Sequence, residues 1–122
     1  MNHANPLLVD HFERPRGAGS FDAGVRGVRR GEAGSEHHGA VVRIELALAA
    51  DGTVADARFK AWGCPATIAC ASLVTEWVRG RTLAVARGAD VRALAEPLEL
   101  AVERLYAPLV VEDALRAAAT ED

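Results

Sequence analysis

Two runs of alternating apolar and polar residues, joined by Asp51-Gly52, limit the fold of this chain more than any other feature. Residues 41–48 and about 53–62 both alternate with a period of two, which is typical of strands with one buried face. Asp-Gly favours a tight turn between two such strands. We therefore predict an antiparallel hairpin. The side chains expected on its buried face are Val42, Ile44, Leu46, Leu48, Ala57, Phe59 and Ala61, and those expected on the other face are Arg43, Glu45, Arg58 and Lys60.

Helices are predicted on both sides of the hairpin. Asn5-Pro6 has the pattern of a helix start, and Pro15 ends that helix. A second helix is predicted to begin at Pro65 and to end near Gly80. Its expected apolar stripe is Cys70, Leu73, Val74, Trp77 and Val78. The order of one helix, antiparallel strands and then several helices predicts an α+β fold, with the helices packed on one face of a small sheet.

The C-terminal third is predicted to contain several more helices. One or two short ones are expected within residues 82–96, with Asp90 as a candidate N-cap. Two others are expected to start at Pro97 and Pro108. Their expected inner faces are Leu98, Ala101, Val102 and Leu105 for the first, and Val111, Leu115 and Ala118 for the second. Glu112 and Arg116 are spaced to pair on the surface of the last helix.

The length of 122 residues predicts a single domain over residues 1–122. Seven of the eleven glycines lie between Gly17 and Gly39, so a Gly-rich loop is expected over about 17–39, with at most a short strand at 25–29.

Composition narrows the functional class. The net charge of −3 argues against a nucleic-acid partner, and no apolar run approaches membrane length. Two cysteines give no disulfide framework, and no signal peptide is recognised, so we expect a cytoplasmic protein with reduced thiols. Residues 14–30 carry five arginines against Asp22, whereas residues 90–122 lean acidic. These segments are either two solvated faces or, alternatively, include a basic surface for an acidic partner.

Cys64 is the leading candidate for chemistry because it lies where a predicted strand ends and a predicted helix begins. The first amides of a helix and its dipole favour a thiolate at this position. A thiolate binds metals and attacks electrophiles. Cys70, in contrast, lies on the apolar stripe of the same helix and is interpreted as core.

His37 and His38 are the other candidate ligands. They are adjacent and point in different directions in an extended backbone, so at most one, His38, is expected to share a site with Cys64. Such a histidine is either simply solvated or a metal ligand. A thiolate with an imidazole suits zinc or iron, but two ligands do not complete a tetrahedral site.

Five stretches resemble the iron–sulfur cluster assembly scaffolds of the IscU type, the group that includes the NifU N-terminal domain. They are residues 10–16 (DHFERPR), 19–22 (GSFD), 56–64 (DARFKAWGC), 72–78 (SLVTEWV) and 112–115 (EDAL). The resemblance covers nearly the whole chain. It implies an α+β scaffold with a three-stranded sheet.

The resemblance also implies a site in which three cysteines, an aspartate and a histidine hold a cluster or zinc. Residue by residue, the first cysteine falls on His38, the aspartate on Ala40 and the second cysteine on Cys64. The remaining histidine and cysteine fall on Tyr106 and Ala107. Only Cys64 is retained.

The chaperone-recognition segment of the family, Leu-Pro-Pro-Val-Lys, falls on residues 100–104, where both prolines are absent. This difference puts recognition by the chaperone in doubt.

The first functional hypothesis is a divergent iron–sulfur cluster assembly scaffold that binds iron, zinc or transferred sulfur through Cys64, with His38 as a second ligand. A [2Fe–2S] cluster normally takes four protein ligands. A homodimer sharing Cys64 and His38 from each chain would supply that number. The resemblance implies a cysteine desulfurase and other assembly proteins as partners.

The alternative is an interaction or regulatory module that keeps the scaffold fold, binds a desulfurase or another assembly partner, and builds no cluster. A zinc-binding or thiol-redox role is a third option. In each case a stand-alone enzyme is not expected.

Overall fold

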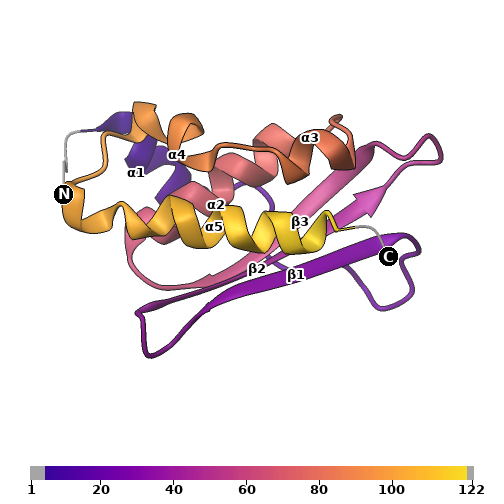
Figure 1. Ribbon diagram of the computed structural model, residues 1–122, viewed down its shortest axis with the longest axis horizontal. Helices are drawn as coiled ribbons and strands as arrows, with labels where there is room; N and C mark the ends of the chain where they lie inside the picture. The colour runs from indigo at the N-terminus through magenta and orange to yellow at the C-terminus, as the bar shows by residue number, and fades with distance from the viewer. Residues whose placement is uncertain (1–4, 121–122) are drawn as a thin grey trace.

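Three antiparallel strands form one sheet in the order β1-β2-β3, and the helices cover one of its faces (Figure 1). The strands are β1 (Val28–Ser35), β2 (Ala40–Leu48) and β3 (Val54–Trp62). The computed structural model describes residues 5–120, so the last two residues of the acidic C-terminal segment lie outside it. The predicted α+β architecture, with helices on one face of a three-stranded sheet, is confirmed.

The helical elements follow the predicted order, and side-chain caps fix where several of them begin. They are α1 (Pro6–Glu13), α2 (Pro65–Val78), α3 (Leu83–Arg87), α4 (Val91–Leu94), α5 (Tyr106–Ala118) and two 3₁₀ turns, η1 (Glu96–Leu98) and η2 (Val102–Arg104). Asn5 accepts a hydrogen bond from the Leu8 amide at 2.8 Å. Asp90 caps α4 in the same way through the Ala93 amide at 3.1 Å. Within residues 5–120, no helix is both long and apolar enough to cross a membrane.

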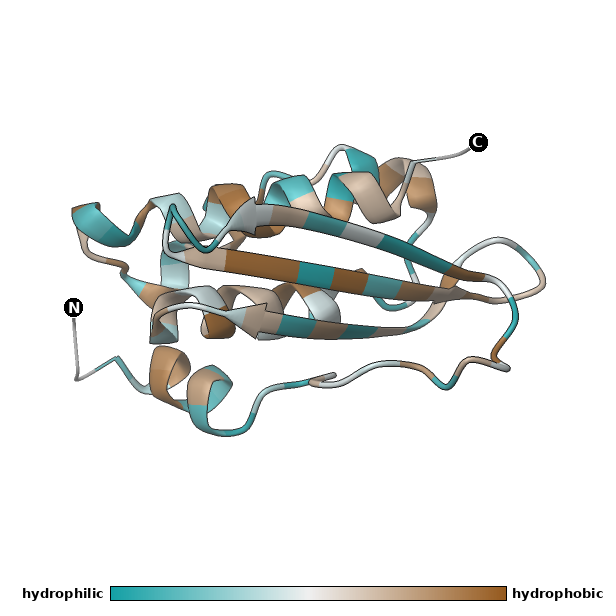
Figure 2. Ribbon diagram, turned by 90° about the horizontal axis from the view of Figure 1, so that it is seen from below, coloured by the Kyte–Doolittle hydropathy of each residue, from teal (hydrophilic) through white to brown (hydrophobic). Residues whose placement is uncertain are grey.

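The hairpin of β2 and β3 has the predicted alternation. Ile44 pairs with Phe59 in the register, and Leu46 pairs with Ala57. These side chains are buried under the helices, and β2 is the most apolar strand in Figure 2. Burial of this face supplies the main apolar contact between the sheet and α2 and α5.

Strand β1 corrects the expectation of a Gly-rich loop over 17–39, because it occupies residues 28–35, later and longer than the short strand expected at 25–29. A Cβ atom on Gly31 would lie 2.2 Å from the backbone nitrogen of Ala118 in α5. The glycine therefore allows the helix to pack closely on the strand. Glycine usually indicates a loop, but Gly31 lies in a strand and makes room for the helix that packs on it.

The segment before α5 also differs from expectation. The helix expected to start at Pro97 is replaced by the two short 3₁₀ turns η1 and η2, because Glu99 ends η1 in a left-handed conformation with φ of 53°. Val102, expected on an inner face, is 80% exposed. Helix α5 begins at Tyr106 instead of Pro108, and the proline lies within its first turn, where a missing N–H is tolerated.

The outer edge of β3 is covered by backbone from the segment that follows α1. The Gly19 amide donates to the Phe59 carbonyl, and the Phe59 amide donates to the Gly17 carbonyl, both at 2.8 Å. This short parallel pairing satisfies edge groups that would otherwise face solvent.

Glu45 lies on the face of the sheet opposite the helices, as predicted, but it is only 1% exposed. Its carboxylate accepts hydrogen bonds from the Phe21 amide at 2.9 Å and from Arg30 Nε at 2.6 Å. Burial alone would raise the pKa of Glu45, but these two donors outweigh it and lower the pKa. The alternation pattern could not reveal this burial, because the cover comes from a distant part of the chain.

We expect Glu45→Gln to lower the free energy of unfolding by about 2 kcal/mol at neutral pH, because it removes the charge from two hydrogen bonds. A carboxyl group whose folded-state pKa is lowered stabilises the fold above its unfolded pKa, and this contribution disappears as the pH falls through the folded-state pKa. The difference between the two proteins should therefore shrink in acid. Urea unfolding at neutral and acid pH measures it. Glu32→Gln, at an exposed carboxylate 3.5 Å from Arg43, is the control and should change little.

Candidate functional site

Three segments that are distant in the sequence meet at one end of the sheet: the β1–β2 turn, the β3–α2 junction and the start of α5 (Figure 1). Gly63, in the β3–α2 junction, has a φ of 154°. A Cβ atom there would lie 3.2 Å from the Gly39 carbonyl oxygen and 3.0 Å from Thr67 Oγ1. Glycine therefore allows the turn to approach the junction that carries Cys64.

Cys64 is the N-cap residue of α2, with extended backbone angles, and its side chain is half-buried. Partial burial raises the pKa of Cys64, but the Tyr106 hydroxyl and the amides of Thr67 and Ala66 outweigh it, so that the net pKa is lowered. The lowered pKa increases the thiolate fraction of a side chain that is only half-buried.

Tyr106 is the residue of this site that pattern analysis did not identify. Its hydroxyl lies 3.1 Å from Cys64 Sγ, although the two residues are 42 positions apart. Thr67 Oγ1 lies 3.6 Å from the same sulfur. The site thus contains one thiol and two hydroxyls, which can stabilise a sulfur anion by hydrogen bonding.

His38 is exposed in the β1–β2 turn, where its Nδ1 lies 2.8 Å from Ser35 Oγ. The rings of His37 and His38 are nearly perpendicular, with their centroids 5.3 Å apart. In residues 5–120, no group of three or more histidine, cysteine, aspartate or glutamate side chains is arranged to hold a metal ion. The expected partnership of His38 with Cys64 as metal ligands therefore stays a prediction.

Cys70 lies in the core, as interpreted from its position on the stripe of α2. Burial, together with the charge of Cys64, raises the pKa of Cys70 to about 12. This thiol is therefore protonated and inaccessible at neutral pH.

An exposed tryptophan adjoins the site. Trp62, the last residue of β3, is 55% exposed and lines a shallow groove of about 200 Å³. The groove lies on the face of the sheet opposite the helices, and its other lining residues are Glu32, Val41, Arg43, Lys60 and Ala61.

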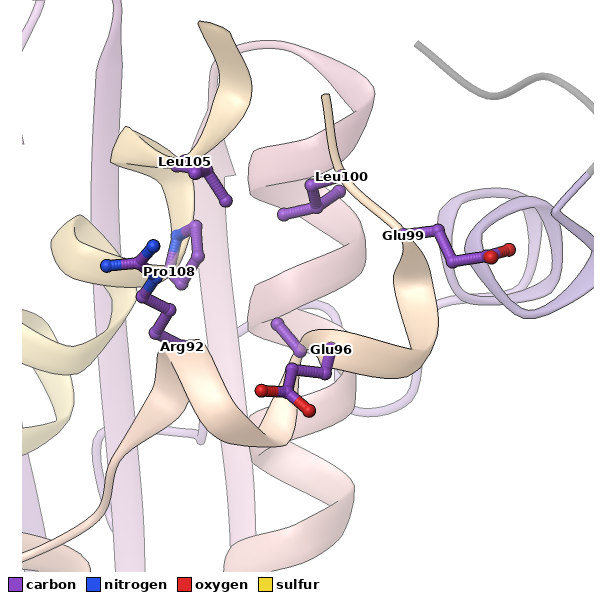
Figure 3. Close-up of a pocket in the computed structure, with 7 residues that line it drawn as sticks. Arg92, Glu96, Glu99, Leu100, Leu105 and Pro108 are labelled. Atoms are coloured by element: carbon purple, nitrogen blue, oxygen red, sulfur yellow. The ribbon is translucent and has the colours of Figure 1, made fainter. Parts of the chain in front are cut away.

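A separate cavity of about 240 Å³ lies between α4, η1 and the start of α5 (Figure 3). Arg92 and Glu96 lie on opposite sides of it, whereas Glu99 points away from it and accepts a hydrogen bond from Asn5. Its lining contains no cysteine or histidine. The Cys64 site is therefore the better candidate for chemistry.

Comparison with known proteins gives a consistent result. A model of the NifU-like N terminal domain matches residues 4–121. The iron-sulfur cluster assembly scaffold protein IscU of Escherichia coli (strain K12) is 40% identical over 111 residues, which are 91% of this chain and 87% of that protein. The protein of the same name from Azotobacter vinelandii is 38% identical over an equal length, with the same coverage of both chains.

Solved structures share the fold at lower identity. The N-terminal part of a nitrogen-fixing NifU-like protein from Brucella abortus superposes with a TM-score of 0.69 at 20% identity, covering 93% of this chain and 90% of that one. A putative iron-sulfur cluster assembly scaffold protein for the SUF system of Fervidobacterium islandicum gives 0.64 at 16% identity, covering 94% and 95%.

Proposed function

Because the chain belongs to the family of NifU-like N-terminal domains, we propose that it acts in iron–sulfur cluster assembly by accepting sulfur on Cys64. The observation that carries the proposal is a half-buried sulfur with a lowered pKa, 3.1 Å from the Tyr106 hydroxyl; among residues 5–120 no group of three or more potential metal ligands is arranged to hold an ion. Sulfur acceptance needs one thiolate, whereas holding a cluster normally takes four protein ligands.

The chemistry is a thiol–persulfide exchange. The Cys64 thiolate attacks the outer sulfur of a protein persulfide, a bond forms between the two sulfurs, and the S–S bond of the donor breaks. The donor cysteine leaves as a thiolate, and the transferred sulfur keeps its proton. The exchange therefore needs no external oxidant or reductant. The donor by chemical class is the persulfide of a cysteine desulfurase.

This proposal favours sulfur over iron or zinc as the cargo of Cys64. The exposed side chain of His38 hydrogen-bonds to Ser35, which supports solvation more than shared ligation within one chain. The metal analysis described below also tests the homodimer in which Cys64 and His38 of both chains share a metal.

Incubation with a cysteine desulfurase and cysteine under anaerobic conditions tests the proposal. After the persulfides are trapped by alkylation, the peptide that contains Cys64 should carry one extra sulfur atom. Cys70 should carry no extra sulfur atom, because its thiol is buried and protonated. Cys64→Ala should abolish the gain, and Cys70→Ala should leave it intact.

Two results would contradict sulfur acceptance. One is a desulfurase that carries its own persulfide and binds the chain while Cys64 gains no sulfur, which would support the interaction-module alternative. The other is stoichiometric metal in protein purified without chelator that is lost on Cys64→Ala or His38→Ala, which would support metal handling.

A further inference from the structure

The hydroxyl of Tyr106 lies 3.1 Å from the sulfur of Cys64. Tyr106 is the first residue of α5, whereas Cys64 caps α2, so the packing of two helices fixes this contact. Thr67 contributes a second hydroxyl at 3.6 Å from the first turn of α2. Arg104 also interacts with the tyrosine hydroxyl.

When Cys64 is ionised, it can only accept, and Tyr106 must then be the donor. A phenol ordinarily ionises at higher pH than a thiol, so the hydroxyl keeps its proton over the range in which the thiol ionises. A hydrogen bond from a neutral donor to an anion is stronger than one between neutral groups. The hydrogen bond from Tyr106 therefore stabilises the thiolate of Cys64 more than the neutral thiol.

We propose that Tyr106 is the positioning residue for sulfur transfer: its hydroxyl holds the Cys64 sulfur as an oriented anion ready to attack the persulfide. The inference rests on the proposed function for the reaction that it serves. After transfer, the hydroxyl remains available as a donor to the persulfide formed on Cys64. The tyrosine thus supplies by hydrogen bonding the anion stabilisation that a bound cation would supply at a metal site.

The ring of Tyr106 packs against the hydrophobic core, and its hydroxyl lies 3.1 Å from the sulfur. Tyr106→Phe therefore keeps the packing and removes the donor alone. Leu109→Ala is the matched control, because Leu109 is exposed and lies three residues along the same helix. It changes α5 without removing a hydrogen-bond donor from the sulfur.

The first measurement is the rate of Cys64 alkylation by iodoacetamide as a function of pH, which needs no desulfurase. For Tyr106→Phe we expect the midpoint to move to higher pH and the rate near neutrality to fall about tenfold. At high pH, where Cys64 is ionised in both proteins, the rate should equal or exceed that of the wild type, because a more basic thiolate is more nucleophilic. Leu109→Ala should follow the wild-type profile. An unchanged profile for Tyr106→Phe overturns the inference.

The second measurement uses the fact that Tyr106 is the only tyrosine in the chain. Its ionisation can be followed by ultraviolet absorbance in the wild type and in Cys64→Ala. Loss of the sulfur partner should shift tyrosinate formation to lower pH, and equal titrations would overturn the inference even if Tyr106→Phe did not fold.

Sulfur transfer then separates the two proposals. With a desulfurase as donor, Tyr106→Phe should load Cys64 about tenfold more slowly at neutral pH and recover at high pH. If wild-type Cys64 never gains sulfur while both titrations shift as expected, the proposed function fails and the role of Tyr106 in holding the anion stands. If the wild type gains sulfur and Tyr106→Phe loads equally fast at neutral pH, the positioning role fails alone.

Discussion

The combined substitution His38→Cys, Tyr106→His and Ala107→Cys should give the chain a zinc site with about one ion per chain. Together with Cys64, it would supply three thiolates and one imidazole, a set that binds zinc tightly. The resemblance to the scaffold family implies this ligand set at these positions. Tyr106 already touches the Cys64 sulfur, and Gly39, next to His38, lies against Gly63.

Metal analysis of protein purified without chelator measures the outcome. The matched control is the same protein with Cys64→Ala, which should bind far less zinc. Ala107 is buried, so its replacement by cysteine costs some stability, on the order of 1–3 kcal/mol, and folding should be checked by circular dichroism. A folded triple variant without zinc would show that the three positions do not converge on Cys64. Ala40→Asp is left out because it would bury a carboxylate without a partner.

Gly31→Ala should destabilise the fold by about 3 kcal/mol, the upper part of the usual range for overpacking. The added Cβ would lie 2.2 Å from the Ala118 nitrogen and 2.5 Å from the Ala114 carbonyl oxygen. Both are backbone atoms of α5, so no side-chain rotation relieves the clash. Either the helix must move away from β1, or the strand must bend.

Gly24→Ala is the matched control for that change. Nothing lies within 4 Å of a Cβ atom at position 24, and its backbone is not in the left-handed region. We expect a change within about 1 kcal/mol, in the stabilising direction, because alanine restricts the unfolded chain. Urea unfolding of the two variants measures the difference, and similar stabilities would contradict the close packing of α5 on β1.

The sequence alone was sufficient for those parts of the fold whose pattern is local. The hairpin could be predicted because its strands alternate around Asp51-Gly52, and the helix from Pro65 because proline marks its start and apolar residues recur at helical spacing. Strand β1 could not, since glycine indicates flexibility in a sequence, and its packing role depends on α5, more than 80 residues later. The helix expected from Pro97 was wrong because Glu99 takes a left-handed conformation that no pattern signals.

In the candidate site, too, one residue could be predicted from local sequence and the other could not. Cys64 could be identified because its position between a strand and a helix is a local property. Tyr106 could not be found by spacing, because α5 was expected to begin at Pro108 and its contact with Cys64 spans 42 positions. One signal was present: the resemblance placed Tyr106 where the family carries a histidine ligand, and a position that carries a ligand in relatives is expected to face the same sulfur.

The backbone pairing of Gly17 and Gly19 with Phe59 has a consequence for how this protein can associate. A second molecule that extended the sheet past β3 would have to displace this pairing at Phe59, whereas among residues 5–120 no strand pairs with the outer edge of β1. Because Cys64 follows β3, growth past β1 would keep two strands, β1 and β2, between the added strand and the strand that leads to the thiol.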